Sequence, residues 1–582
     1  MEQLTRFFFE PKQILHKRYE ALRALCVEKL SAKEVATRFG YSIFTVNAMK
    51  RDFVKAIKNG QTPLFFLTPT PGRKPKENRD ELKQQIITLR KQNLSVLDIK
   101  AALGSLGYQV SHDFIHRVLV EDGFTRLPRR TILEKRKGAV TKLAAPKSQP
   151  IDWKAELDKK YHSELGIGLL AFLPLLAKLK VNEWIQWAGY PETTELNHIQ
   201  NVLSFMALKL GNYERYSHDD MWAMDRSIGG LFAGLNVLPK NATLSSYSYR
   251  VERQMNLRFL QAMLKTFKQK ELLSGMINLD FSAIPHWGDA SILENNWSGK
   301  RRKSLKSILA LLCQDPDSGI LCYSDAEVRH NKQSDCVLEF VNFWKNEGEN
   351  PKCLIFDSKV TTYENLVKLD RDGVKFITIR RRSKNLLAKV ADLAPESWQE
   401  VNLKNTARKY TKVKVHDSAV KLPTVKHSFR QLTITEHGRE KPTFILTNEW
   451  DWDSAQIIAQ YGRRWMVEKG ISEQIDFFHL NSLSSSIVVK VDFDLTLSLA
   501  AHNIYRAMAL MLEGHESETS KSLYAKFFSN GGGFEIKNDR VRVFLKKKRH
   551  LPILIEALNE IGPIPIPWLE NRFLEFQLWT VT

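Results

Sequence analysis

The sequence predicts a multidomain chain of mixed α+β and α/β class, with helical units first and a mixed sheet flanked by helices later. Three observations support this prediction. The chain has 582 residues, enough for about three to five domains. Its 43% hydrophobic and 26% charged residues exclude collagen-like and wholly disordered chains. Apolar residues recur at helical spacing in the first half, whereas short apolar runs bounded by turn residues begin after Lys270.

Most of the excess positive charge lies near the N-terminus. The whole chain carries a net charge of +22. Residues 1–150 hold 29 Lys and Arg against 14 Asp and Glu, a net of +15, whereas the remaining 432 residues have a net of +7. A local basic excess indicates a polyanionic partner. Since this region lacks a long basic amphipathic helix, nucleic acid is favoured over an anionic membrane.

Two pairs of short helices are expected in the basic region, at residues 1–60 and 77–130. In the first pair, Ser31 and Glu34 form a capping box, Gly40 permits a turn, and Ser42 can cap the second helix. The second pair repeats this pattern with Ser95 and Asp98, Gly107, and Ser111. The pattern is typical of helix-turn-helix DNA-binding units, the alternative being small hairpins of an ordinary helical bundle. The residues expected to contact DNA are Thr45, Asn47, Lys50, Arg51, His112, His116 and Arg117.

Two basic linkers are expected to separate these units from each other and from the rest. Residues 61–76 form a proline-rich linker in which Arg73 and Lys74 would follow a DNA groove or a line of phosphates; a plain solvated linker is the alternative. Residues 131–160 form the second linker. Residues 161–268 are expected to be a helical domain that packs and positions the others.

Residues 269–510 are expected to form the mixed sheet flanked by helices. Three strand candidates are followed by a helix, a strand, a helix and a further strand, an order that favours right-handed crossovers. A β-rich insertion is expected at about residues 385–450, followed by one helix along residues 454–478. Residues 511–582 are expected to be a C-terminal helical region.

Two aspartates follow apolar strand candidates in this region. Asp280 ends the run that begins at Met276, and Asp357 follows Leu-Ile-Phe. An aspartate at the end of a strand is often only a helix cap, and this alternative is stronger for Asp357 than for Asp280, because Pro285 makes an immediate helix awkward.

A third carboxylate lies on an otherwise apolar helical stripe. Positions 457, 461, 464, 468, 471, 475 and 478 share one face and comprise Ile, Tyr, Arg, Glu, Ile, Ile and Phe. Because burying a charge is costly, Glu468 is expected either to pair with Arg464 or to bind a metal while Arg464 and Tyr461 hold it. Two aspartates and a glutamate that converge would suit Mg²⁺ or Mn²⁺, and two such ions can catalyse phosphoryl transfer.

These residues resemble a family. Residues 461–468 follow the Tyr-x2-Arg-x3-Glu signature of a large group of bacterial insertion-sequence transposases. Those enzymes have a ribonuclease H-like core with an Asp-Asp-Glu triad, and the resemblance covers residues 230–510. It implies that Asp280, Asp357 and Glu468 are catalytic ligands of two Mg²⁺ or Mn²⁺ ions. It further implies that Tyr461 and Arg464 support Glu468 and the DNA backbone.

One departure from the family signature bears on activity. The signature continues Glu-x6-Lys, but this chain has Ile475 at that position, so either another cation contacts the DNA backbone or the activity is impaired. Lys469 is near in sequence but faces another side of the helix, and Glu473 is a rival third carboxylate that falls off the apolar stripe.

The expected function is therefore that of a DNA transposase acting on terminal inverted repeats and target DNA, as a homodimer when two ends are joined. The alternatives are a degenerate or domesticated transposase that only binds DNA, and a stand-alone ribonuclease H-like nuclease. The chain has no Gly-x4-Gly-Lys-Ser/Thr loop, so no nucleotide cofactor is expected. Five Cys without CxxC pairs and the lack of a membrane-spanning run favour a cytoplasmic, nucleoid-associated protein.

Overall fold

The computed structural model describes residues 2–60, 79–121 and 160–579, apart from gaps at 92–93, 95, 194, 215–225, 236–237, 240–242, 245–246, 286–293, 299–302, 329, 404–410, 423–424 and 481–487. Arg73, Lys74, Ser95 and the linker at residues 131–159 therefore lie outside the described residues. The chain divides into two compact units, Met1–Leu82 and Lys83–Thr582.

The first unit contains the first predicted helix pair. Its helices are α1 (Glu2–Phe9), α2 (Ile14–Cys26), α3 (Ala32–Phe39) and α4 (Ile43–Lys58). Ser31 and Glu34 form the predicted capping box, Gly40 takes a left-handed conformation (φ 62°), and Ser42 accepts a hydrogen bond from the Thr45 N–H. Val35, Phe39 and Val46 are buried in one core, as predicted.

The second unit begins with the second helix pair. Its first helices are α5 (Arg79–Lys91), which spans the boundary, α6 (Val96–Ser105) and α7 (His112–Glu121). Gly107 takes the left-handed conformation (φ 84°), and the Ser111 hydroxyl accepts a hydrogen bond from the Phe114 N–H at 3.2 Å. These contacts confirm the predicted turn and cap.

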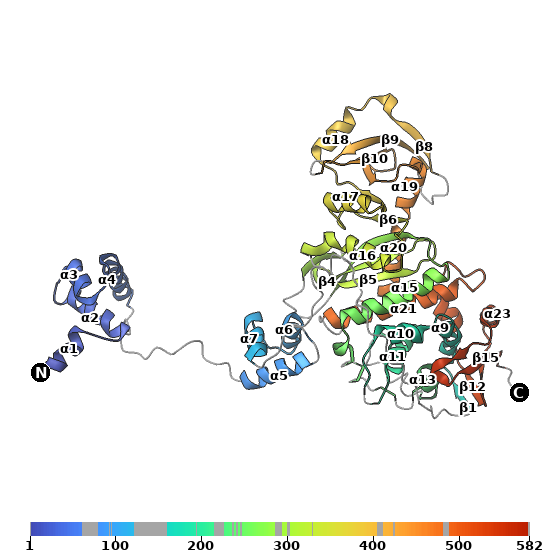
Figure 1. Cartoon of the computed structure of the whole chain (residues 1–582), viewed down its shortest axis with the longest axis horizontal. Helices are drawn as coiled ribbons and strands as arrows, with labels where there is room; N and C mark the ends of the chain where they lie inside the picture. Colours follow the sequence, from blue (N-terminus) through green and yellow to red (C-terminus); the bar gives the residue numbers. More distant parts are fainter. Residues whose placement is uncertain are drawn as a thin grey trace. The chain divides into compact units, whose positions relative to one another are not determined.

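A mainly helical region follows and packs against a long helix from later in the chain. It comprises η1 (Ile167–Phe172), α9 (Leu173–Lys178), α10 (Val181–Ala188), α11 (His198–Leu210), α13 (Arg226–Ala233), η3 (Ser248–Arg250) and α15 (Arg253–Gln269). The long helix is α21 (Val488–Ala509), which lies beside α11 and α15 (Figure 1).

The predicted mixed sheet is present and has ten strands. Its order is β3 (Glu294–Ser298), β4 (Lys303–Gln314), β2 (Met276–Pro285), β6 (Cys353–Phe356), β7 (Lys375–Ile379), β11 (Thr443–Thr447), β10 (Ser428–Thr435), β9 (Lys412–Lys421) and β8 (Gln399–Asn402), with β5 (Leu321–Val328) also on β4. Strands β2, β6 and β7 are parallel, and the other pairs are antiparallel. The β-rich insertion extends this same sheet, because β11 pairs with β7. The predicted mixed α/β class is thus confirmed.

Alternation along the central strands divides the core between the two faces of the sheet. Phe356 and Phe376 belong to the larger core with α16 (Cys336–Lys345) and α17 (Tyr363–Arg371). Ile355 and Ile377 point to the opposite face and pack with α19 (Ser454–Gly462). The helix α18 (Lys384–Ala391) and a turn, η5 (Pro395–Ser397), precede β8, and η4 (His330–Asp335) precedes α16.

The helix expected along residues 454–478 is broken in two, so that prediction is wrong in this detail. α19 ends at Gly462 and α20 (Trp465–Asp476) begins after Arg464. The Arg464 N–H bonds the Tyr461 carbonyl at 3.1 Å, a tight three-residue turn. The Arg463 carbonyl accepts the Met466 N–H at 3.0 Å and also the Asn278 side-chain amide at 3.0 Å, so β2 contacts the break directly.

The C-terminal region also differs from its prediction as a helical region. In the described residues, four C-terminal strands and β1 (Lys160–Ser163) form one sheet. Its order is β1, β12 (Gly532–Lys537), β13 (Arg540–Leu545), β15 (Arg572–Leu578) and β14 (Pro565–Ile566). The helical segments are α22 (Ser520–Leu523), the π-helical turn η6 (Tyr524–Phe528), α23 (Leu551–Ile561) and η7 (Pro567–Leu569). A tight turn at Asn538 (φ 54°) joins β12 to β13 as an antiparallel hairpin. Asparagine tolerates this left-handed conformation, which favours a hairpin over a continuous helix here.

Candidate active site

The two predicted aspartates lie next to each other at one edge of the parallel strands. Leu279 of β2 is the register partner of Phe356, the last residue of β6. Asp280 and Asp357 directly follow these partners. Adjacent strands are about 4.8 Å apart, so the two backbones present their carboxylates side by side. Asp280 does not end its strand as predicted, because β2 continues along β4 to Pro285.

Arg464 connects Asp280 to Glu468. One Nη atom of Arg464 donates to Asp280 Oδ2 at 2.7 Å, and the other donates to Glu468 Oε1 at 2.7 Å. The side chains of Arg464 and Asp280 are about one-fifth exposed, whereas that of Glu468 is 54% exposed. The predicted Arg464–Glu468 salt bridge is therefore present, and it includes the first aspartate as well.

Burial and charge perturb the groups around this arginine. Burial raises the pKa of Asp280, although the Arg464 guanidinium and the Phe281 N–H oppose the rise. Burial lowers the pKa of Arg464, but Asp280, Tyr461, Glu468 and Asp357 outweigh burial and hold that pKa above its ordinary value. Burial, with smaller contributions from the carboxylates of Asp357 and Asp280, raises the pKa of the Tyr461 phenol to about 12, although Arg464 opposes the rise. Tyr461 therefore stays neutral beside both aspartates.

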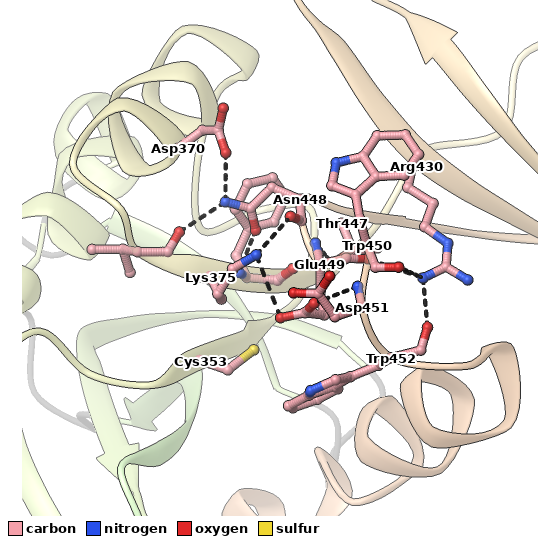
Figure 2. A network of polar contacts seen from close by, with 12 residues as sticks. Cys353, Asp370, Lys375, Arg430, Thr447, Asn448, Glu449, Trp450, Asp451 and Trp452 are labelled. Atoms are coloured by element: carbon pink, nitrogen blue, oxygen red, sulfur yellow. Dashed lines mark hydrogen bonds and ion pairs between the residues drawn. The ribbon is translucent and has the colours of Figure 1, made fainter.

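A polar network at the opposite end of β7 holds the start of α19 (Figure 2). The Asn448 side chain accepts the Phe376 N–H at 2.8 Å and donates to the Asp370 carboxylate at 2.8 Å. Arg430 donates to the carbonyls of Glu449, Trp450 and Trp452. These bonds fix the loop before Asp453, which caps α19. The helix then carries Tyr461 towards the aspartates.

A cavity of about 940 Å³ opens beside two of the three carboxylates, Asp357 and Glu468. Asp357, Glu468, Tyr461 and Arg464 line it, together with apolar residues from the α19 face of the sheet. Its other cationic residues are Arg380, Arg381, Arg382 and Arg439. Among the described residues that line the cavity, five arginines stand against two carboxylates, a composition that suits a polyanion.

The carboxylates suit a metal by their chemistry, but not by their arrangement in the described residues. Carboxylate oxygens are the ligands that Mg²⁺ and Mn²⁺ prefer. Within the described ranges, however, no group of three or more His, Cys, Asp or Glu side chains is placed to hold a metal ion. The Arg464 guanidinium bonds two of the three carboxylates, and a metal ligated by both would have to displace it.

Glu473, the rival third carboxylate, and Ile475, the residue in place of the signature lysine, both lie away from this site. Glu473 contacts His502 of α21 at 3.3 Å and accepts the Ser520 hydroxyl at 2.9 Å. Burial raises the pKa of Glu473, but these partners outweigh it and lower the pKa to about 2. Glu473 therefore pairs with His502 and Ser520 and does not belong to the candidate active site. Ile475 is half-buried on α20 and does not line the cavity.

The residues predicted to contact DNA lie on exposed helix surfaces wherever they are described. Those of the first unit, all on α4, are Thr45, Asn47, Lys50 and Arg51, and those of α7 are His112, His116 and Arg117. Arg51 lies 3.3 Å from Asp52, an exposed pair that a phosphate can displace. Arg73 and Lys74 lie outside the described residues.

Sequence reasoning missed several residues of the cavity. Trp465 is 56% exposed and lines the cavity directly after Arg464. Arg439 comes from the β10–β11 hairpin, and Asn278 holds the break before α20. An exposed tryptophan inside the signature was a usable signal, whereas only the strand pairing brings Arg439 and Asn278 to the site.

No family model matches the chain, and a search of curated proteins found no match. Among the helices of the described residues, none is long and apolar enough to cross a membrane.

Proposed function

We propose that this chain is a DNA transposase with a ribonuclease H-like catalytic core. The observation that carries the proposal is the register of β2 and β6, which sets Asp280 beside Asp357, while Arg464 joins Asp280 to Glu468. These are the residues that the transposase signature implies. The strand order β5-β4-β2-β6-β7, in which only β4 is antiparallel to the others, also supports a ribonuclease H-like core.

The arginines of the cavity would bind the DNA backbone at the scissile phosphate. Arg381 and Arg439 would neutralise phosphates, and the neutral Tyr461 phenol would donate a hydrogen bond rather than repel them. Exposed residues of α4 and α7 would recognise the terminal inverted repeats of a double-stranded element. Joining two ends would require a homodimer.

Asp280, Asp357 and Glu468 would hold Mg²⁺ or Mn²⁺, two ions in the complete site. When bound, these ions supply activation of the attacking hydroxyl and stabilisation of the leaving oxygen. The chain itself would have to release Asp280 and Glu468 from Arg464. The Arg464 guanidinium, once released from the two carboxylates, would then bind a phosphate. Arg464 would thus hold the carboxylates before the metal binds and the DNA afterwards.

A catalytically degenerate DNA-binding protein is the second candidate. Ile475 in place of the family lysine favours it, as does the arginine that already neutralises two carboxylates. Sequence-specific binding without metal-dependent nicking would select this candidate. A stand-alone nuclease would cleave DNA without forming joined products.

The test is an Mg²⁺-dependent joining assay on a plasmid that carries the DNA flanking the gene. Wild type is compared with Asp357→Ala and with Asp372→Ala, an exposed aspartate paired with Lys345. We expect joined products from wild type and Asp372→Ala, with a loss of at least about 100-fold for Asp357→Ala. Full joining by Asp357→Ala would refute the assignment.

A further inference from the structure

A second cavity lies at the same edge of the sheet as the candidate active site. It has a volume of about 440 Å³ and is lined by Thr378, Leu446 and residues of α17. Thr378 alternates along β7 with Ile377, which belongs to the α19 face of the sheet. Leu446 and Leu366 belong to the opposite core. The two cavities therefore open on opposite faces of one sheet.

Hydroxyl and cationic side chains dominate the second cavity. The hydroxyl groups come from Ser334, Ser358, Thr361, Thr362, Tyr363 and Thr378, and the basic groups from His330, Lys359 and Arg381. Glu364 is the one acidic residue among the described residues that line it. This composition matches the side chains that contact nucleic-acid phosphates.

Two of these hydroxyls are buried without a hydrogen-bond partner. Thr378 is only 2% exposed, and its Oγ1 has no hydrogen-bond partner among the described residues. Thr361 Oγ1 is likewise buried and unpaired. Buried polar atoms are nearly always paired in native proteins, so these two hydroxyls are available to bond a ligand or water in the cavity.

The two cavities meet at Asp357. Asp357 lines the first cavity, and the next residue, Ser358, lines the second. Arg381 lines both, and its Nε donates to Ser358 Oγ at 3.3 Å. A nucleic-acid backbone that ran from one cavity to the other would therefore pass Asp357 and the other candidate carboxylates.

We infer that the second cavity binds the phosphodiester backbone of a nucleic-acid strand that passes Asp357. The inference rests on the proposed function and extends it to a particular strand. Two strands share this chemistry, namely the flanking strand beyond the scissile phosphate and the incoming target strand. Thr361 and Thr378 would donate to phosphate oxygens, while Lys359 and Arg381 would neutralise them.

The first experiment measures how salt weakens DNA binding by the full chain and by Lys359→Ala. Lys352→Ala is the matched control, because Lys352 is exposed and precedes the other end of β6. Three duplexes distinguish the strands: an end with flanking DNA, the same end without it, and an unrelated target. Losing one phosphate contact lowers the salt slope by about 0.9. For Lys359→Ala we expect the salt slope to fall on one duplex. A fall on the flanked end alone assigns the cavity to the flanking strand, and a fall on the unrelated target assigns it to the target strand. Lys352→Ala should keep the wild-type slope on all three duplexes.

A second variant, Thr378→Val, removes a buried hydroxyl while keeping the side-chain shape. We expect the free chain to be at least as stable to heat, because an unpaired hydroxyl is replaced, while DNA affinity falls by about tenfold. Wild-type affinity and slope on all three duplexes for both variants would overturn the inference while leaving the proposed function standing. Failure of wild type to bind any duplex would overturn both.

Discussion

Arg464 is the residue that unites the candidate site. Its guanidinium bonds Asp280 and Glu468, whose carboxylates would otherwise face each other without a cation. The sequence predicted half of this arrangement, since the Arg464–Glu468 spacing of four residues places both on one helical face. The bond to Asp280 spans 184 residues, and only the packing of α20 on β2 produces it.

Replacing Arg464 with Met should destabilise the chain, because the largely buried Asp280 carboxylate would lose its cationic partner and keep only the Phe281 N–H. We expect the free energy of unfolding, measured by urea denaturation, to fall by about 3 kcal/mol. Arg463→Met is the control, since the Asp317 partner of Arg463 is half exposed and such a pair is worth about 1 kcal/mol or less. Adding Asp280→Asn to Arg464→Met should recover part of the loss. Equal losses from the two arginine variants would contradict this account.

At the scale of elements, local patterns predicted most strands and helices of the central sheet. The apolar run before Asp357 and the helix from Tyr363 occur as β6 and α17. Both were predictable because their hydrophobic patterns lie within the segment itself. The break between α19 and α20 was not predictable in this way. Arg463 and Arg464 are good helix formers, and the break depends on Asn278, which is distant in sequence.

Glu473 should make the packing of α20 on α21 depend on pH. Burial opposes its charge, but the contacts with His502 and Ser520 lower its pKa to about 2 in the folded chain. An unfolded glutamate has a pKa of about 4.3. Because the folded pKa is the lower one, the stabilisation is complete above about pH 4.3 and is lost as the pH falls towards 2.

The measurement is the free energy of unfolding as a function of pH for Glu473→Gln. This variant should be less stable by about 2 kcal/mol at pH 7, and its stability should fall less steeply than that of wild type between about pH 4.3 and 2. Glu440→Gln, which alters an exposed glutamate, should follow the wild-type curve. If Glu473→Gln and wild type lost stability in parallel, the carboxylate would not be responsible.

At the scale of the whole molecule, segments far apart in the sequence contact one another, and no local sequence pattern predicts these contacts. Lys160 of β1 pairs with Glu535 of β12, and the sheet so formed replaces the predicted C-terminal helices. A Cβ atom on Gly168 would lie 2.1 Å from the Phe528 carbonyl oxygen, so a glycine is required for this close approach. Such requirements come from the tertiary structure, and for that reason the sequence did not predict them.

The separation into two compact units leads to a prediction about DNA recognition. Met1–Leu82 has its own buried core and carries 16 Lys and Arg against 9 Asp and Glu. Lys83–Thr582 contains the carboxylates, the arginine-lined cavity and the sheet. Deletion of residues 1–60, which removes α1 to α4 and leaves α5 whole, should leave the circular dichroism and the thermal unfolding transition of the larger unit intact, because that unit retains its core.

The same deletion should reduce affinity for the terminal repeats by about 100-fold while reducing affinity for unrelated duplex by only about tenfold. The reason is that α4 would supply base contacts, whereas the arginines of the remaining unit would supply contacts to phosphates of any sequence. Electrophoretic mobility shifts at matched salt give both affinities. An equal fall for the two duplexes would mean that residues 1–60 contribute charge alone, and sequence recognition would then belong to α7.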